Sequence, residues 1–462
     1  MQIGRQQAKL AITAGRSMPV RKEGRETGAK RGFGFYLVLV SLLVEFGRPQ
    51  DIIPGIKVIP FPSIIDLLIG VTVVMSGKLN VENKQTKLYI GLLILMVGHV
   101  PFATNNYWAA MVLKDMLLYF CFFLGIVAFV DTIEKMKTLV NAWLMVHLVL
   151  AILGIMSGGK GVGGWLGDEN DFCMEMNVAV PFAYFMLLGA QSKASRVLYL
   201  SSLCIFILTA MVTLSRGGFI GLAAVGFYCW LKSSKKGRAV VLVGVVIIFM
   251  LIFAPEKYWE EIQSTTDERT LTVGTGAERL YTWGIGLDMF LGNPIFGVGQ
   301  GNFPWNFQEY QGEDRFNERS LAGRAAHSMY FTLIPEMGFV GALMFFLMAW
   351  NNYTTVSRLR MLGRAILKSG SNDRAKEEQD IAFGVSVGSA LEAAMIGYLV
   401  SSVFISTLWY PTFWIITALT VALGNLYLNK RPAGELSAAK SAIPRLPKSS
   451  FPTGMTRPRP AR

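Results

Sequence analysis

The chain has 462 residues, of which 52% are hydrophobic and 16% are charged, and its formal net charge is +13. Soluble domains carry about 25% charged residues, so this composition excludes an ordinary soluble enzyme and indicates a protein that lies in a lipid bilayer. The positive charge does not indicate nucleic-acid binding, because no basic patch alternates with stacking aromatic side chains on a soluble domain.

Apolar runs long enough to cross a hydrocarbon core of about 30 Å recur along the chain. They predict an all-α polytopic membrane protein with about twelve transmembrane helices. The expected segments are 33–47, 63–77, 87–103, 109–130, 138–157, 173–190, 197–214, 217–231, 239–254, 327–350, 381–403 and 408–428. The first two are short. Basic residues precede the first, as in a signal peptide, but no small-residue cleavage pattern follows, so we expect an uncleaved anchor.

Lys and Arg gather in alternate connections, and this predicts the side of the membrane on which each connection lies, because positive short loops stay in the cytoplasm. The positive connections are the N-terminal tail, 78–87, 135–137, 193–196, 232–238, 358–376 and the C-terminal tail. We therefore expect basic cytoplasmic tails at 1–32 and 430–462 and one membrane domain at 33–429. Attraction to anionic membrane lipids is a secondary effect of the same charges.

Two of the opposite connections are long enough to carry chemistry. The first, at about 157–172, is rich in glycine and ends in Asp168, Glu169, Asn170 and Asp171. These side chains can cap the next helix or bond sugar hydroxyls, which we favour over a Mg²⁺ or Ca²⁺ site. The Gly-Gly-Lys-Gly stretch within it lacks the spacing of a phosphate-binding P-loop. The second connection, 255–326, is expected to be a large periplasmic loop with helices of its own.

Two arginines lie on this side. Arg216 stands between two apolar runs beside a helix start, where it can bind an anion such as phosphate or extend to the membrane surface as an interface residue. Arg279 is a solvated charge or a ligand at the start of a run whose apolar residues recur at helical spacing, so this piece can lie flat on the bilayer. The alternating glycines at 297, 299 and 301 then predict a tight turn that allows close backbone approach.

His327 begins the tenth apolar segment directly after the polar loop. An imidazole at this interface can accept a hydroxyl proton near neutral pH, although a structural role is the alternative. His99 and His147 lie within apolar segments, where we expect hydrogen-bonded packing. Glu336 lies deeper in the tenth segment, and an ionisable group at that depth needs a partner or a cavity.

Three motifs in this order resemble the pattern of the bacterial O-antigen ligase and polymerase superfamily, over about 165–430. They are Ser-Arg-Gly-Gly around Arg216; Glu-Arg-Leu-x-x-Trp from Glu278 with the later Asn-Pro-x-x-Gly-x-Gly-x-Gly-Asn-Phe; and His327-Ser328 with Gly338 and Gly341. The resemblance implies a membrane-embedded, C-type glycosyltransferase-like fold in the bacterial inner membrane, with a helical periplasmic loop over a lipid-substrate cavity and no metal or cofactor.

The resemblance also implies the reaction and the partners. The donor would be a glycan linked to polyprenyl pyrophosphate, and the acceptor a hydroxyl of lipid A-core, a protein or a growing glycan. His327 would be the general base of an inverting transfer, Arg216 and Arg279 would hold the pyrophosphate, and Ser328, Asp168 and Asn170 would contact substrate.

The choice between ligase and polymerase stays open, because both use the same donor chemistry. A secondary transporter or lipid flippase is the alternative from another class. The number of apolar segments favours it, whereas the long outer loop and the scarcity of charges deep in the segments oppose it.

Overall fold

The computed structural model describes residues 32–53, 55–232, 275–313, 320–369 and 375–429, together with Gly237, Gly244 and Phe316. This part of the chain is built from helices. The expected segment 239–254 falls outside the described residues except for Gly244, as do the basic tails and the start of the long loop.

Every other expected apolar segment coincides with a helix of the described part. The α-helices are α2 (Phe33–Gly47), α3 (Pro49–Ile52), α4 (Phe61–Met75), α5 (Lys84–His99), α6 (Asn106–Phe129), α7 (Ile133–Met156), α8 (Glu169–Gly189), α9 (Lys193–Val212), α10 (Arg216–Lys232), α14 (Thr275–Gly292), α15 (Phe303–Gln311), α16 (Met329–Ser369), α17 (Ala375–Ser401) and α18 (Pro411–Gly424). Short 3₁₀ turns span Ile56–Val58 and Gly164–Leu166, and a π turn, Asn425–Asn429, follows α18.

Among the described residues, seven helices are long and apolar enough to cross a membrane, namely α6 to α9 and α16 to α18. Helices α2 and α4 are apolar but shorter. The prediction of a polytopic membrane protein is therefore supported by the helices themselves, whereas the number of twelve spans stays a prediction.

Polar side chains determine where several of these helices begin. The first backbone N–H groups of a helix have no partner within it, and a side-chain oxygen just before the helix can accept from one of them. The residues that do so are Asn83, Asn105, Thr132, Asp168 and Ser192, at the starts of α5, α6, α7, α8 and α9. Short polar connections thus separate long apolar helices.

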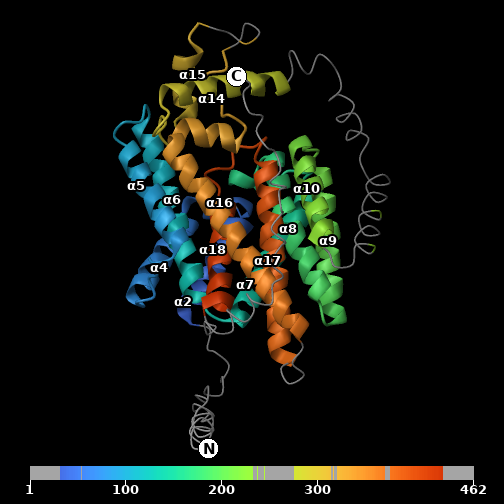
Figure 1. The fold of residues 1–462 in the computed structure, drawn as a ribbon. Coiled ribbons are helices and arrows are strands. Elements are labelled where there is room, and N and C mark those ends of the chain that lie inside the picture. Colours follow the sequence, from blue (N-terminus) through green and yellow to red (C-terminus); the bar gives the residue numbers. More distant parts are fainter. Residues whose placement is uncertain are drawn as a thin grey trace, which may run out of the picture.

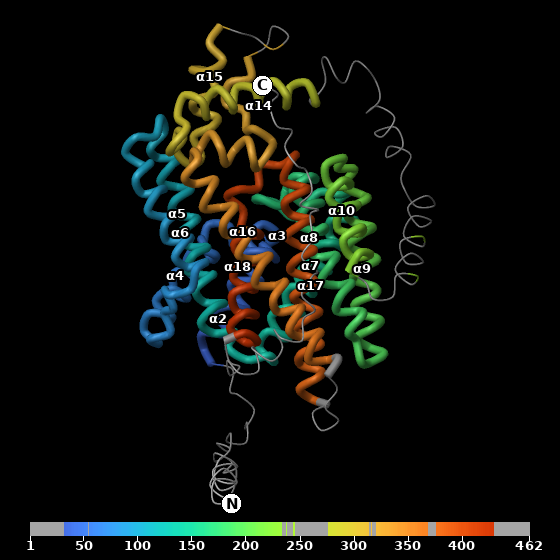
Figure 2. The backbone as a smooth tube through the Cα atoms, in the orientation of Figure 1, coloured from blue at the N-terminus to red at the C-terminus, as the bar shows by residue number. Residues whose placement is uncertain are grey.

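The long helices stand side by side in a bundle, and α14 lies across one end of it with α15 beside it (Figures 1 and 2). Helices α8 and α18 are buried along almost their whole length and form the centre of the bundle. The described residues 275–313 and 320–326, here called the crossing segment, therefore close one end of an apolar bundle.

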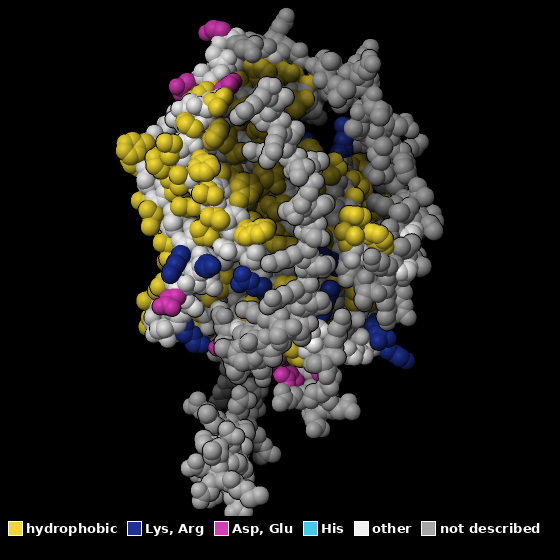
Figure 3. Space-filling model, in the orientation of Figure 1, with side chains coloured by type: hydrophobic (Ala, Val, Ile, Leu, Met, Phe, Trp, Pro, Cys, Tyr) yellow, Lys and Arg dark blue, Asp and Glu magenta, His cyan; other side chains and the backbone are white. Residues whose placement is uncertain are grey.

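The opposite end collects the connections that are rich in lysine. Lys78 and Lys135 both contact Asp131, at 3.1 and 2.6 Å, and Lys137 contacts Asp380 at 2.8 Å. In the view of Figure 3, hydrophobic side chains cover the middle of the face, and most of the visible Lys and Arg lie below them. The described connections around Lys78 and Lys135 thus meet at Asp131, and the side of the membrane that this end faces stays a prediction.

Helix α16 departs from the single continuous segment that the sequence predicts. It is interrupted at Gly338, whose φ of 60° and ψ of −167° are not helical. The backbone groups that the interruption releases bond the turn after α14: Val298 N donates to Pro335 O and Gly299 N to Glu336 O, both at 2.9 Å. Irregular backbone at this depth needs such protein partners, because lipid offers none.

The same turn accepts hydrogen bonds from the far side of the interruption. Phe339 N donates to Pro294 O at 2.8 Å and Val340 N donates to Ile295 O at 3.1 Å. A Cβ at Gly338 would lie 2.5 Å from the carbonyl carbon of Ile295. The glycines at 297, 299 and 301 have φ of 80°, 97° and 68°, so the expected close approach of this turn is confirmed and its partner is the interrupted helix.

Candidate active site

Helix α14 is held directly against the residues that precede His327. The indole Nε1 of Trp283 donates to the carbonyl of Ala326 at 2.9 Å, and its ring stacks on Phe331 with centroids 4.8 Å apart. Glu278 forms an ion pair with Arg324 at 2.7 Å. Since Arg279 lies between these two contacts on α14, the helix brings Arg279 to the His327 turn.

A small hydrophobic core stabilises the crossing segment. It contains the buried side chains Ile285, Met289, Phe303, Phe307, Leu321 and Ala326. These residues come from α14, from α15 and from the connection that leads to His327. Burial of apolar side chains is the main favourable contribution to packing in water, so this core gives the site a fixed wall outside the apolar bundle.

His327 has an unusual backbone conformation. Its φ is 48°, in the left-handed region that residues other than glycine rarely adopt. Ala326 and Ser328 on either side are buried, whereas the His327 side chain is exposed. Such conformations persist where the surrounding structure enforces them, and they concentrate at functional sites. The left-handed turn thus presents the imidazole at the surface between two buried neighbours.

The charges around His327 favour its neutral form. Partial desolvation is the largest cause that lowers its pKa, and the positive charge of Arg279 lowers the pKa further, while Asp168 acts in the opposite direction. Partial desolvation and the charge of Arg216 likewise lower the pKa of Arg279. A guanidinium stays protonated despite such a shift. Arg216, Arg279, His327 and Asp168 therefore share one electrostatic neighbourhood, although they come from four separate parts of the chain.

Arg216 begins α10 two residues after Leu214, another non-glycine residue in the left-handed region, with a φ of 55°. Ser215 caps the helix, because its Oγ accepts a hydrogen bond from Gly218 N at 3.0 Å. A Cβ at Gly218 would lie 2.2 Å from the Sγ of Cys173 in α8. The Ser-Arg-Gly-Gly motif thus fixes the arginine at a capped helix start and lets α10 pack closely on α8.

Asp168 and Asn170 connect this turn to the glycine-rich connection. Asp168 caps α8 and accepts hydrogen bonds from the backbone and the side-chain amide of Asn170, at 2.8 and 3.0 Å. Asn170 in turn accepts a hydrogen bond from Ser215 Oγ at 2.7 Å. The expected capping role of Asp168 is confirmed, and its exposed carboxylate remains accessible to a ligand.

Asp171, in the same acidic run, accepts a hydrogen bond from Tyr410 Oη at 2.9 Å. Within the described ranges, no group of three or more His, Cys, Asp and Glu side chains could hold a metal ion. Asp168 thus caps a helix and Asp171 binds a tyrosine hydroxyl.

The two deeper candidates differ in their surroundings. Ser328 is 1% exposed, and its hydroxyl has no hydrogen-bond partner among the residues that the structure describes. Glu336 is 2% exposed and accepts from Gly301 N at 2.8 Å and from Phe303 N at 3.0 Å. The indole of Trp409 donates to the same carboxylate at 3.0 Å. Glu336 thus joins the interrupted helix to the start of α15 and to the α17–α18 connection.

The other histidines have the packing roles that we expected. His99 Nδ1 lies 3.0 Å from Gln300 Oε1. His147 Nδ1 bonds the carbonyl of Trp143 at 2.8 Å, and its Nε2 lies 2.9 Å from Glu175. Both imidazoles are therefore enclosed in the bundle, unlike His327.

Sequence reasoning missed the contacts that assemble the site. Trp283 stands in the second motif, but its contacts, like those of Arg324 and Trp409, join segments far apart in the chain, and no local pattern identifies such pairs. Ser215 is different, because a serine directly before an apolar helical run is a recognisable capping signal.

Residues 177–346 match the family model of the O-antigen ligases. This match supports the O-antigen ligase and polymerase superfamily. The matched range includes Arg216, Arg279 and His327 and ends on the far side of the interruption in α16, while Asp168 and Asn170 precede it. No curated protein matches the chain. The match bears out the resemblance seen in the motifs and, with the apolar helices, indicates an integral membrane enzyme of glycan ligation or polymerisation.

Proposed function

We propose that the protein transfers an oligo- or polysaccharide from polyprenyl pyrophosphate to an acceptor hydroxyl, without a metal and with inversion at the anomeric carbon. The observation that supports this most directly is the common electrostatic neighbourhood of Arg216, Arg279 and His327 at one end of an apolar bundle. An amphiphilic donor needs both parts, a cationic site for its head and an apolar bundle for its tail.

The two arginines act on the leaving group. As the bond between the anomeric carbon and the phosphate oxygen breaks, its electron pair remains on the pyrophosphate, and negative charge develops there. Arg216 and Arg279 offer planar, permanently charged donors for this oxyanion. Donors held in place before the reaction stabilise the transition state without reorganisation, so they serve where other transferases use a divalent cation.

His327 acts on the acceptor. The acceptor oxygen forms the new bond to the anomeric carbon from the face opposite the pyrophosphate, and its proton passes to the neutral imidazole. The lowered pKa of His327 favours the neutral form that this step needs. Asp168 and Asn170 would bond sugar hydroxyls at the edge of the site, and Ser328 would contact substrate from within the His327 turn.

We further propose that the enzyme lies in the bacterial inner membrane, with both termini in the cytoplasm and the crossing segment in the periplasm. The acceptor is a lipid A-core or protein hydroxyl in a ligase, or the end of a growing glycan in a polymerase. The test is the length distribution of glycan on the polyprenyl carrier in cells that lack the protein. Single repeat units would accumulate without a polymerase, and long chains would accumulate without a ligase.

Rescue experiments then test the residues. Wild type and Arg358→Gln, a control at an exposed arginine on the lysine-rich side, should restore the carrier pool. His327→Ala and Arg279→Gln, present at equal protein levels, should not. An unchanged carrier pool together with normal surface glycan in the deletion strain would refute the transferase, and substrate-coupled ion flux would favour a transporter instead.

A further inference from the structure

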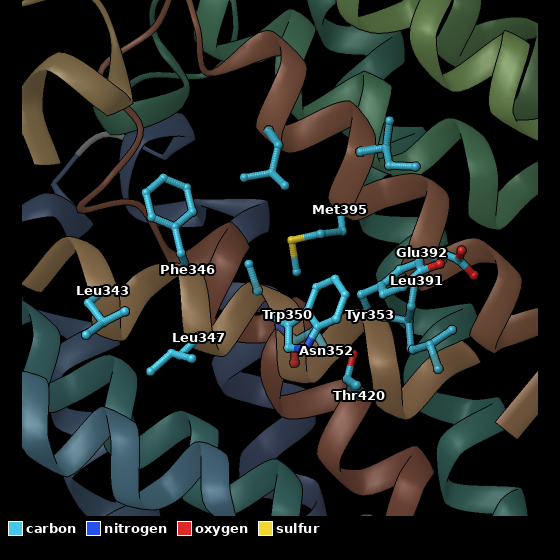
Figure 4. A pocket seen from close by; sticks show the side chains of 14 residues that line it. Leu343, Phe346, Leu347, Trp350, Asn352, Tyr353, Leu391, Glu392, Met395 and Thr420 are labelled. Carbon is cyan, nitrogen blue, oxygen red and sulfur yellow. The ribbon is translucent and has the colours of Figure 1, made fainter. Parts of the chain in front are cut away.

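An apolar groove runs along the bundle where α16, α17 and α18 meet (Figure 4). Its volume is about 510 Å³, within the range of about 300–1,000 Å³ that ligand sites occupy. Aromatic rings of α16 form one wall, namely Phe346, Trp350 and Tyr353, and Leu391 and Met395 of α17 form the other. From Leu343 to Val356 the groove covers about 20 Å of helix axis.

Three polar residues of the groove are already engaged. Asn352 donates to Thr417 Oγ1 at 2.8 Å and accepts from Gln85 at 2.6 Å. Thr420 donates to the carbonyl of Ile416. Glu392 forms an ion pair with Arg360 at 2.7 Å. Apart from the indole of Trp350 and the hydroxyl of Tyr353, an occupant therefore meets hydrocarbon surface in these walls, which fits an apolar chain better than a sugar.

One end of the groove is in contact with Tyr330, in the first turn after His327. Tyr330, three residues after His327, stacks on Phe346 with ring centroids 6.4 Å apart. Its hydroxyl donates to the carbonyl of Leu399 at 2.9 Å, and Leu399 itself lines the groove. Glu392, about two helical turns before Leu399 on α17, lies at the other end of the groove. One end of the groove thus lies next to the site proposed for the pyrophosphate.

We propose that this groove holds the polyprenyl chain of the donor, with the pyrophosphate at the Arg216, Arg279 and His327 end. This inference rests on the proposed function. The rings of Phe346, Trp350 and Tyr353 offer flat faces to planar isoprene units. Residues 430–462 are a poor alternative occupant, because they are rich in Lys, Arg, Pro and Ser.

The groove would orient the donor's polyprenyl chain more than it would raise the affinity for the donor. Lipid tails are as apolar as a protein groove, so transfer from one to the other gains little hydrophobic free energy. Close packing of many carbon atoms still favours one path of the chain over others. A chain fixed along α16 holds its pyrophosphate at one depth beside His327, and this raises the rate for donors long enough to fill the groove.

The test compares one glycan on a long polyprenyl pyrophosphate and on geranyl pyrophosphate, whose short tail reaches only the first part of the groove. Ile396→Trp and Leu347→Trp fill the groove from α17 and α16. Met361→Trp is the control, at an exposed position of α16 outside the lining. Leu347 is 41% exposed, so this second variant keeps the test valid where the more enclosed Ile396→Trp does not fold.

We expect wild type and Met361→Trp to favour the long donor in kcat/KM by about tenfold, the scale at which apolar pockets discriminate. The filled variants should lose most of this preference and keep the rate with the geranyl donor. A preference that survives filling would overturn the proposal. An equal loss with both donors would also overturn it, since it would indicate a structural bilayer lipid. Transfer from neither donor by wild type would instead refute the proposed function.

Discussion

Replacement of Gly338 by alanine should separate the crossing segment from α16. The conformation of Gly338, with φ of 60° and ψ of −167°, belongs to a region that is essentially restricted to glycine, and a residue held there costs about 1–3 kcal/mol. The added Cβ would also lie 2.5 Å from the backbone carbonyl of Ile295. Backbone cannot rotate away as a side-chain tip can, so the two chains have to move apart.

The contacts at stake set the magnitude. Four backbone hydrogen bonds join residues 294–299 to residues 335–340, and each contributes about 0.5–1.5 kcal/mol net. Their complete loss would cost about 2–6 kcal/mol, against a total stability of about 5–15 kcal/mol. We expect Gly338→Ala to lower the melting temperature of the purified protein, to shift the equilibrium between the joined and separated forms by at least about thirtyfold, the factor that corresponds to about 2 kcal/mol, and to reduce glycan transfer.

Gly284→Ala is the matched control. Gly284 lies in α14, is exposed, and a Cβ there would meet nothing within 4 Å. Alanine in a helix interior stabilises by about 0.5–1 kcal/mol relative to glycine, so this variant should melt no lower than wild type and transfer normally. Equal melting temperature and equal transfer rate for Gly338→Ala and Gly284→Ala would refute the reasoning about the interruption.

Three further predictions concern the site. The transfer rate should fall as the pH drops through the pKa of His327, which partial desolvation and the charge of Arg279 hold below the usual value of about 6.5, because only neutral imidazole accepts a proton. The residual transfer by purified Arg279→Gln should show this acidic limb at higher pH, and an identical limb in its rate–pH profile would contradict the assignment. Glu336→Gln places an amide donor among two backbone N–H groups and an indole N–H. It should destabilise by about 1–3 kcal/mol, and an unchanged denaturation midpoint would show that these bonds contribute nothing net. Trp283→Phe retains an aromatic ring but loses the bond to Ala326. It should cost about 0.5–1.5 kcal/mol and lower kcat more than it raises KM, and a change in KM alone would place this residue in binding and not in positioning His327.

Hydropathy and capping residues predicted most of the bundle, because the length and polarity of a membrane helix are local properties of the sequence. The interruption of α16 is not local. Residues 327–350 form one apolar run, and only the turn at 293–299, which bonds the released backbone groups, explains why the helix breaks at Gly338. The glycines of that turn indicated a close approach, but the sequence did not identify its partner.

In the candidate site, too, some residues could be predicted from local sequence and others could not. His327 and Arg216 stood out because each lies where a polar connection meets an apolar helix. Arg279 could be selected only through the family pattern, since its position depends on the contacts of Trp283 with Ala326 and Phe331. Glu336 was expected to have a partner, and its three donors come from segments that no sequence pattern connects to it.

The interruption at Gly338 also divides α16 mechanically. The short part that follows His327 and the first residues beyond Gly338 share backbone hydrogen bonds with the turn at 293–299, whereas the rest of the long part packs among the apolar helices. A sideways load on the long part, such as a change in bilayer thickness that tilts it, bends the chain near the glycine before it displaces the histidine. In the proposed mechanism, the general base is thereby insulated from strain in the bundle.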